Sequence, residues 1–384
     1  MKLLVVGAGV GGLAVARGAL AAGHDVRVFE RAEQPRTTGA AITVWAGGVG
    51  ILRESSVRLD GAGARIDGID ARTDAGERLY TIDVLASTNR LGHESLTVPR
   101  RTLLERMAEG LPPGTVEYGR CFDRFADDGR RVTVGFADGS TATGDVLIGA
   151  DGHRSAVRRQ LWGHDPTTPA GWATWQGLGT FLADVTGPRH GIMINGRSGF
   201  CGLMPAGEGL LQWWFSYPCT TDSSGPHLPA LRRRFGAWAD PAPLVLEKVD
   251  EAEIEMFPHY THRVPPRWGT GRATLVGDAA HTMPPVVAQG ANQALEDAWA
   301  LTAALADTTA RDLDGTSRTL RGYERARRRR VAPIARLAAT EYTYRYRPPI
   351  VDRLTPSPVV SWAYGQWLTQ TSDYLRGARR RRSG

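Results

Sequence analysis

The stretch MKLLVVGAGVGGLAVARGALAAGHDVRVFE, residues 1–30, decides the fold. The short apolar run Lys2–Val6 predicts a buried parallel strand, and a glycine-rich turn follows it directly. Leu13–Ala22 has the composition of a helix that ends at Gly23, and Asp25–Glu30 predicts a second strand. A strand, a turn, a helix and a strand within about 30 residues form a βαβ unit.

The glycine spacing in this unit predicts a dinucleotide site. Gly7 permits a tight turn, Gly9 lets the backbone approach a pyrophosphate, and Gly12 lets the helix pack close to the sheet; position 11 is also glycine, Gly11. The helix N-terminus then directs free N–H groups at the phosphates. Glu30, at the end of the second strand, can accept hydrogen bonds from ribose hydroxyls and would repel the 2′-phosphate of NADP. A plain glycine turn with a surface glutamate is the alternative, and the βαβ context disfavours it.

Two further predicted strands end in an Asp–Gly or Gly–Asp pair. Asp145–Ala150 leads into Asp151, which we expect to serve a pyrophosphate or ribose. Arg272–Val276 leads into Gly277 and Asp278, whose carboxylate can hold a ribityl hydroxyl. A helix follows at 292–305, and its positive end suits a reduced flavin. The residues predicted to contact the flavin around that helix start are Pro285, Gln289, Gly290, Ala291 and Asn292.

Together these three segments resemble the FAD-dependent aromatic hydroxylases of the p-hydroxybenzoate hydroxylase type. The resemblance covers about residues 1–340 and implies an α/β fold, with a Rossmann-like FAD-binding domain (GR2/PHBH-type), an interleaved β-sheet substrate domain and C-terminal helices. It places the FAD-binding domain at 1–70, 98–165 and 266–345, the substrate domain at 71–97 and 166–265, and a helical tail at 346–384.

Further stretches, such as Gly39–Trp45 and Leu203–Pro205, are similar to the subgroup that contains FAD-dependent urate hydroxylase and salicylate hydroxylase. That resemblance implies that FAD is bound non-covalently and that NADH or NADPH is the co-substrate. It implies a flavin C4a-hydroperoxide that transfers one oxygen atom of O2 to a small aromatic substrate. It also implies further residues that line the FAD: Arg31, Thr43, Arg101 and Cys121.

The chain departs from the family pattern at two places. Ala288-Gln289-Gly290 stands where the family has Gly-Gln-Gly, so one permissive glycine is lost beside the flavin. Phe200 and Gln212 align with an arginine and a tyrosine of the urate enzymes. An anionic purine would lose its counter-charge at these positions, which disfavours urate as the substrate.

The expected substrate sheet is rich in aromatic residues. Because a strand buries alternate side chains, Trp213 and Trp214 must face opposite sides, and one face is expected to stack on a planar substrate. No metal ligand set or catalytic nucleophile is recognisable. Gln212 is a weak candidate for orienting the substrate, and His281 is a weak candidate for a general base, although a structural histidine is favoured. The pocket candidates are Trp45, Trp175, Phe200, Gln212, Trp213, Trp214 and Pro284.

The gross composition adds few constraints. The 384 residues carry a net charge of +7, and their three separated cysteines favour a cytoplasmic protein without disulfides. A monomer or a homodimer is expected. No membrane segment or nucleic-acid-binding element is expected, and the arginine runs 325–330 and 379–382 are interpreted as a solvated helix face and a chain end. A flavin epoxidase, an oxidative decarboxylase, a Baeyer–Villiger-type enzyme and a non-enzymatic flavin redox sensor remain alternatives. A halogenase is disfavoured because a Trp-x-Trp-x-Ile-Pro segment is missing.

Overall fold

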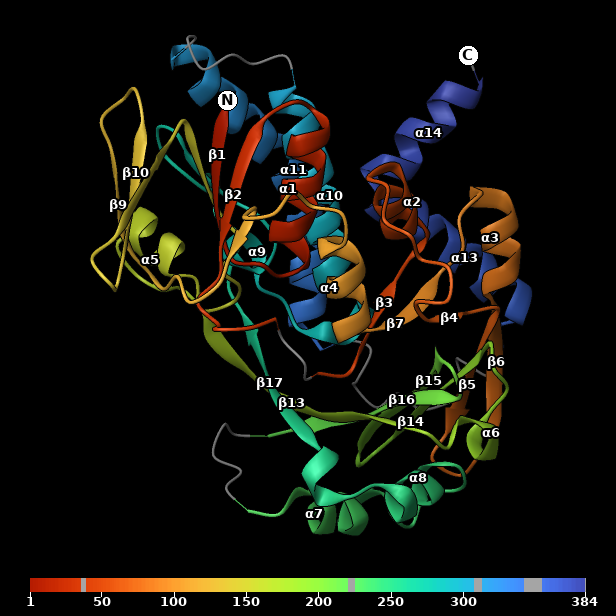
Figure 1. Ribbon diagram of the computed structural model, residues 1–384. Coiled ribbons are helices and arrows are strands. Elements are labelled where there is room, and N and C mark those ends of the chain that lie inside the picture. The colour runs from red at the N-terminus through yellow and green to blue at the C-terminus, as the bar shows by residue number, and fades with distance from the viewer. Residues whose placement is uncertain (36–38, 220–224, 307–312, 342–353, 384) are drawn as a thin grey trace.

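The computed structural model describes residues 1–35, 39–219, 225–306, 313–341 and 354–383 (Figure 1). Its first layer is a five-stranded parallel sheet in the order β18-β12-β1-β2-β8. Because the strands are parallel, the turns that follow them meet at one edge of the sheet. The strands are β1 (Lys2–Val6), β2 (Asp25–Phe29), β8 (Val116–Glu117), β12 (Val146–Gly149) and β18 (Ala273–Leu275).

Helices and a small sheet enclose this parallel sheet. Helix α1 packs against α10, and both lie against the buried strands (Figure 1). A three-stranded antiparallel sheet follows α4, and its middle strand alternates buried and half-buried residues as a one-sided sheet should. These elements are α1 (Val10–Ala21), α4 (Arg100–Ala108), β9 (Phe122–Asp127), β10 (Val132–Phe136), β11 (Thr141–Gly144), α5 (Ala156–Trp162), α9 (Asp278–His281), η2 (Pro285–Val287), α10 (Gly290–Leu305) and α11 (Leu313–Ala339).

A seven-stranded mixed sheet forms the second layer, in the order β17-β13-β16-β15-β14-β5-β6. Strand β5 pairs in parallel with β14, so segments more than 100 residues apart share one sheet. Helices α7 and α8 cover its lower face (Figure 1). The elements are β5 (Gly68–Thr73), β6 (Arg78–Asp83), β13 (Thr168–Gly179), α6 (Leu182–Val185), β14 (His190–Gly196), β15 (Gly199–Gly207), β16 (Leu210–Pro218), α7 (His227–Phe235), α8 (Ala242–Lys248), η1 (Glu251–Glu253) and β17 (Glu255–Thr261).

The remaining elements join the two layers. They are β3 (Ala41–Val44), α2 (Ala46–Glu54), β4 (Ala64–Arg65), α3 (Val84–Leu91), β7 (Leu96–Pro99), α13 (Ser357–Thr371) and α14 (Asp373–Ser383). The predicted mixture of a Rossmann-like domain, an interleaved β-sheet domain and C-terminal helices is confirmed. Strand β5 begins at Gly68, three residues before the substrate domain expected from 71. The boundary expected at 345–346 lies outside the described residues.

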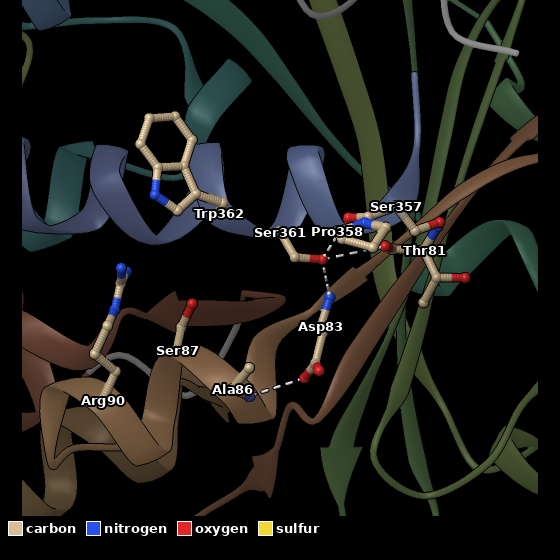
Figure 2. Close-up of a pocket in the computed structure, with 9 residues that line it drawn as sticks. All are labelled: Thr81, Asp83, Ala86, Ser87, Arg90, Ser357, Pro358, Ser361 and Trp362. Atoms are coloured by element: carbon tan, nitrogen blue, oxygen red, sulfur yellow. Dashed lines mark hydrogen bonds between the residues drawn. The ribbon is translucent and has the colours of Figure 1, made fainter. Parts of the chain in front are cut away.

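Helix α13 covers the edge of the seven-stranded sheet (Figure 2). The hydroxyl of Ser357 accepts a hydrogen bond from the backbone N–H of Thr81 at 3.0 Å, and that of Ser361 accepts one from Asp83 at 2.9 Å. A surface groove of about 490 Å³ lies along this seam, beside the exposed indole of Trp362. Because β6 is an edge strand, these bonds satisfy donors that would otherwise template pairing with another chain.

Candidate active site

In the glycine turn between β1 and α1, packing requires glycine at two positions and leaves room for a side chain at two others. Gly7 has φ +106°, and a Cβ there would lie 2.4 Å from the Ala150 carbonyl oxygen. A Cβ on Gly12 would lie 1.9 Å from the carbonyl oxygen of Gly7. A Cβ on Gly9 would meet no atom within 4 Å, and one on Gly11 would make ordinary contacts. Gly9 therefore keeps the N-terminus of α1 open to a ligand rather than serving internal packing.

The Glu30 side chain is held beside this turn by backbone N–H groups. Its two carboxylate oxygens accept hydrogen bonds from the N–H groups of Ala8, at 2.9 Å, and Ala32, at 3.0 Å. The side chain stays half-buried, so its remaining lone pairs can accept hydroxyl donors. This arrangement fits the ribose of a dinucleotide.

Three of the side chains that the family resemblance implied for FAD binding lie on exposed surface. Arg31 and Cys121 lie at the carboxyl end of β2, where the N–H of Arg120 donates to the Glu30 carbonyl at 2.8 Å. Arg101 lies on α4, where Nε is 2.7 Å from a carboxylate oxygen of Glu105. The positions of Arg31 and Cys121 suit the adenine end of FAD. The role of Arg101 toward the flavin stays a prediction.

Asp151 is anchored by the helix that follows it. Its carboxylate accepts hydrogen bonds from the Ser155 hydroxyl at 2.5 Å and from the N–H groups of Ala156 and Val157 at 2.7 and 3.1 Å. Burial raises its pKa, although these three donors oppose the rise. The carboxylate thus caps the start of α5, and its Oδ1, which accepts a single hydrogen bond, keeps a lone pair for the predicted cofactor contact.

The turn after β18 leaves a carboxylate available at the same edge of the sheet. Gly277 has φ +59°, and its N–H donates to Asp297 at 2.8 Å. Asp278 begins α9, and its Oδ1 lies 3.7 Å from where a Cβ on Gly290 would be, at the start of α10. Within the described residues the Asp278 carboxylate has no hydrogen-bond donor. This geometry fits the predicted contact with a ribityl hydroxyl.

Asn292 clamps the start of α10 to β3 and α2. Its Oδ1 accepts from the N–H of Trp45 at 2.9 Å, and its Nδ2 donates to the carbonyls of Thr43 at 2.9 Å and Ala288 at 2.7 Å. Both N–H groups of its Nδ2 are used in these bonds. Asn292 therefore positions Thr43, a predicted flavin contact, and does not donate to the cofactor itself. Gln289 is also buried and bonded to Gln293 at 2.7 Å, whereas Gly290 and Ala291 are half-buried and Pro285 is exposed.

We expect Asn292→Ala to lower the free energy of unfolding by about 3 kcal/mol, because it leaves a buried N–H and two carbonyls without partners. Urea unfolding of the apoprotein measures this change. The exposed Asn89→Ala on α3 is the matched control and should stay within about 0.5 kcal/mol of the parent. A loss below about 1 kcal/mol at Asn292 would contradict the clamp.

Ala288, which replaces a family glycine, has a left-handed backbone with φ +49° and ψ +39°. This conformation costs an alanine roughly 1–2 kcal/mol of strain. A glycine avoids that strain but loses more conformational entropy on folding, which costs about 0.5–1 kcal/mol relative to alanine. Ala288→Gly should therefore stabilise the protein by about 0.5 kcal/mol in thermal unfolding. Ala300→Gly, in the middle of α10, should instead destabilise it by about 1 kcal/mol. Equal destabilisation by both changes would refute the strain at Ala288.

His281 is a structural residue and not an accessible base. Its ring is fully buried against Trp268, and Nε2 lies 2.5 Å from Asp297, which also binds Arg327 at 2.8 Å. Burial opposes ionisation of Asp297, but these two partners outweigh it and lower the pKa of its carboxyl. Because His281 cannot reach a substrate, the weak prediction of a general base there is wrong.

The seven-stranded sheet offers one aromatic face to the FAD-binding layer. Phe200 and Trp214 lie on adjacent strands with ring centroids 6.4 Å apart, and they pack with Val286 of η2. Trp213 faces the other way and is fully buried under α7 and α8, together with Trp175. Phe200 and Trp214 therefore remain pocket candidates. The prediction that Trp175 and Trp213 line the pocket is wrong, because they lie on the face of the sheet that points away from the FAD-binding layer.

Trp45, from the FAD-binding side, and Gln212, from β16 of the seven-stranded sheet, border the same region. Trp45 precedes α2, and its indole N–H donates to the Val287 carbonyl at 3.4 Å. Gln212 is buried and donates from Nε2 to the Ala41 carbonyl at 2.9 Å, whereas its Oε1 has no partner among the described residues. An unpartnered buried amide oxygen is suited to accept a hydroxyl or N–H of a substrate. Pro284 is buried at the start of η2.

Other residues of this region carry only weak signals in the sequence. Tyr364 and Trp367 of α13 make edge contacts with Trp45, with centroids 5.8 and 6.3 Å away. Their spacing of three residues is typical of a helix face, but it does not identify which element they cover. Val286 and Met193, which pack with Phe200, resemble ordinary apolar residues in the sequence.

The residues present fit FAD. The open position at Gly9 suits a pyrophosphate, the Glu30 carboxylate a ribose, and the free Asp278 carboxylate a ribityl hydroxyl. All three lie at the carboxyl edge of the parallel sheet, and the start of α10 leads from there to Phe200 and Trp214. Among the described residues, no group of three or more His, Cys, Asp or Glu side chains is placed to hold a metal ion, and no helix is long and apolar enough to cross a membrane.

Comparison with known proteins agrees with this site. The family model described as an FAD binding domain matches residues 1–338. The chain is 31% identical to the FAD-dependent urate hydroxylase of Klebsiella pneumoniae subsp. pneumoniae, over 87% of this chain and 88% of that protein. It is 30% identical to the 3-amino-4-hydroxybenzoate 2-monooxygenase of Streptomyces cremeus, over 95% of both chains.

A solved structure extends the match to three dimensions. The crystal structure of Klebsiella pneumoniae HpxO complexed with FAD and uric acid superposes with a TM-score of 0.82. The two chains are 28% identical, and the match covers 98% of this chain and 95% of that one. The chain therefore belongs to the family of the FAD binding domain and, within it, to the FAD-dependent monooxygenases of the aromatic hydroxylase type.

Proposed function

We propose that the protein uses NADH or NADPH and O2 to insert one oxygen atom into a small aromatic compound held against Phe200 and Trp214. The observation that carries this proposal is the meeting of an aromatic sheet face with the loop that begins α10. FAD, when bound, supplies the electron transfer and the activation of O2.

The protein's own part is to hold, orient and desolvate the substrate. Trp214 is half-buried, and its ring face can stack on a planar molecule. The free amide oxygen of Gln212 can accept one polar group and fix which edge of that molecule points to the flavin. Apolar packing around Phe200 and Val286 excludes water, which limits loss of the reactive oxygen species to side reactions.

The substrate differs from urate in this proposal. Among the described residues, the strand pairing places no arginine beside these positions: Phe200 is paired with Ser216 across the sheet and Gln212 with Met204. A purine anion would thus enter a region without a positive counter-charge. A neutral phenol, aminophenol or indole matches the aromatic lining and the single free acceptor better.

Anaerobic stopped-flow spectroscopy tests the proposal. The FAD-loaded protein is mixed with NADH or NADPH in the presence of phenols, hydroxybenzoates, indoles and urate, and flavin bleaching is followed. We expect one of the neutral aromatic classes to accelerate reduction by about tenfold or more, and urate to have little effect. Acceleration by urate alone, or by none of these compounds, would overturn the proposed substrate class.

A further inference from the structure

The arginine run of α11 divides between two faces of the helix. Arg327 and Arg330 point to the neighbouring helices, where Arg327 binds Asp297 at 2.8 Å and Arg330 binds Asp373 at 2.9 Å. Arg325, Arg328 and Arg329 are spaced at i, i+3 and i+4, so they share a different face. The first pair stabilises the fold, whereas the second set is available for another purpose.

This second face lines a groove of about 660 Å³. Its opposite wall is the segment 266–271 that leads into β18, and this wall adds Arg267. Arg321 of α11 completes a set of five arginines around the groove. The hydroxyls of Thr270 and Ser317 are further possible donors along the same walls.

The carboxylate in the groove wall does not neutralise these charges. Glu324 is buried and accepts hydrogen bonds from the Trp268 N–H at 3.1 Å, the Thr274 hydroxyl at 2.7 Å and Arg321 at 2.7 Å. The Glu324 carboxylate therefore accepts hydrogen bonds mainly from the protein interior, and Arg321 is the one groove arginine that it binds. Within the described part of the chain, the other four arginines of the groove have no carboxylate partner.

Mutual repulsion is evident at the centre of the group. Burial lowers the pKa of Arg321, and the nearby guanidinium groups of Arg267 and Arg325 lower it further, although Glu324 opposes this. The Nε atoms of Arg321 and Arg328 are buried without a hydrogen-bond partner in the described structure. An anion in the groove would relieve the repulsion between these guanidinium groups.

The groove lies away from the FAD site. Segment 266–271 precedes β18, so it lies at the amino edge of the parallel sheet, whereas the turns at Gly7–Gly12 and Gly277 follow their strands at the carboxyl edge. The two regions therefore lie at opposite ends of the parallel strands. A ligand of the groove is thus distinct from FAD, and its binding does not depend on the proposed substrate.

We propose that this groove binds a small molecule that carries at least two linked phosphate groups. Planar guanidinium forks match phosphate oxygens in pairs, and several forks on two facing walls match a polyphosphate better than a single anion. The volume of about 660 Å³ is in the usual range for a small-molecule site. A free polyphosphate and a nucleoside polyphosphate share this chemistry.

Isothermal titration of the FAD-loaded protein with inorganic triphosphate tests the proposal, because bound FAD blocks the other phosphate site. We expect saturable binding of one triphosphate per chain that weakens with added salt. ATP in a parallel titration distinguishes the sources: binding tighter than triphosphate indicates a nucleotide, and weaker binding indicates a free polyphosphate. The absence of saturable one-to-one binding of both compounds would overturn the proposal.

A matched pair of double variants separates the groove from the general positive field. Arg325→Gln with Arg329→Gln removes two groove charges, and we expect at least about tenfold weaker triphosphate binding. Arg233→Gln with Arg336→Gln removes two exposed charges outside the groove, on α7 and near the end of α11, and should change binding less than about twofold. Equal weakening in both variants would show a diffuse electrostatic effect and overturn the site.

Discussion

We expect Gly9→Val to abolish FAD binding while leaving the apoprotein folded. The backbone of Gly9, with φ −78° and ψ −173°, is extended and accessible to valine, and a Cβ there meets no protein atom within 4 Å. The added side chain instead occupies the approach to the N-terminus of α1, where a pyrophosphate would accept hydrogen bonds. FAD affinity should fall by at least about 100-fold, corresponding to about 2.7 kcal/mol, in a fluorescence titration.

The neighbouring Gly12→Ala provides the contrast. Its Cβ would lie 1.9 Å from the Gly7 carbonyl oxygen, so the turn or the helix must move. We expect a loss of about 3 kcal/mol in apoprotein stability from this overpacking, whereas Gly9→Val should change it by about 0.5 kcal/mol or less. If Gly9→Val destabilised the apoprotein as much as Gly12→Ala, the assignment of Gly9 to the cofactor would fail.

Substitution of the adjacent Trp213 and Trp214 should have large and opposite effects on stability and on ligand binding. Trp213→Ala should lower the free energy of unfolding by about 3–5 kcal/mol, because its fully buried indole fills the core beneath α7 and α8. Trp214→Ala should lower stability less, since this ring is half-buried on the opposite face. It should instead weaken binding of the stimulating aromatic compound by roughly 30-fold, equivalent to about 2 kcal/mol of lost ring contact.

Urea unfolding and ligand titration of both variants separate the two faces. A Trp214→Ala protein that binds the aromatic compound as tightly as the parent would place the substrate elsewhere. A refolded Trp213→Ala protein with a selective loss of aromatic binding would mean that the sheet presents its other face to the substrate.

The Rossmann-like part could be predicted from sequence because its signals are local. The apolar run Lys2–Val6 and the glycines after it specify a buried strand and a tight turn within ten residues. The same holds for β12 and β18, the strands that lead into Asp151 and Gly277. The alternation of side chains along a strand also predicted correctly that Trp213 and Trp214 face opposite sides of the sheet.

Other features depend on distant partners. Helices α7 and α8 cover only one side of the sheet, and this decides that Trp214, and not Trp213, faces the FAD-binding layer. The burial of His281 depends on Asp297 and Arg327, which lie 16 and 46 residues later in the chain. Neither of these two features is encoded in a local pattern.

Oxygen-isotope labelling tests the central claim most directly. The FAD-loaded protein is supplied with NADH or NADPH, the aromatic compound that accelerates flavin reduction, and ¹⁸O₂, and the product is analysed by mass spectrometry. The account predicts a product that contains one ¹⁸O atom, formed in proportion to the reductant consumed. Consumption of reductant with an unlabelled or unchanged aromatic compound, and hydrogen peroxide as the only product of O₂, would contradict it.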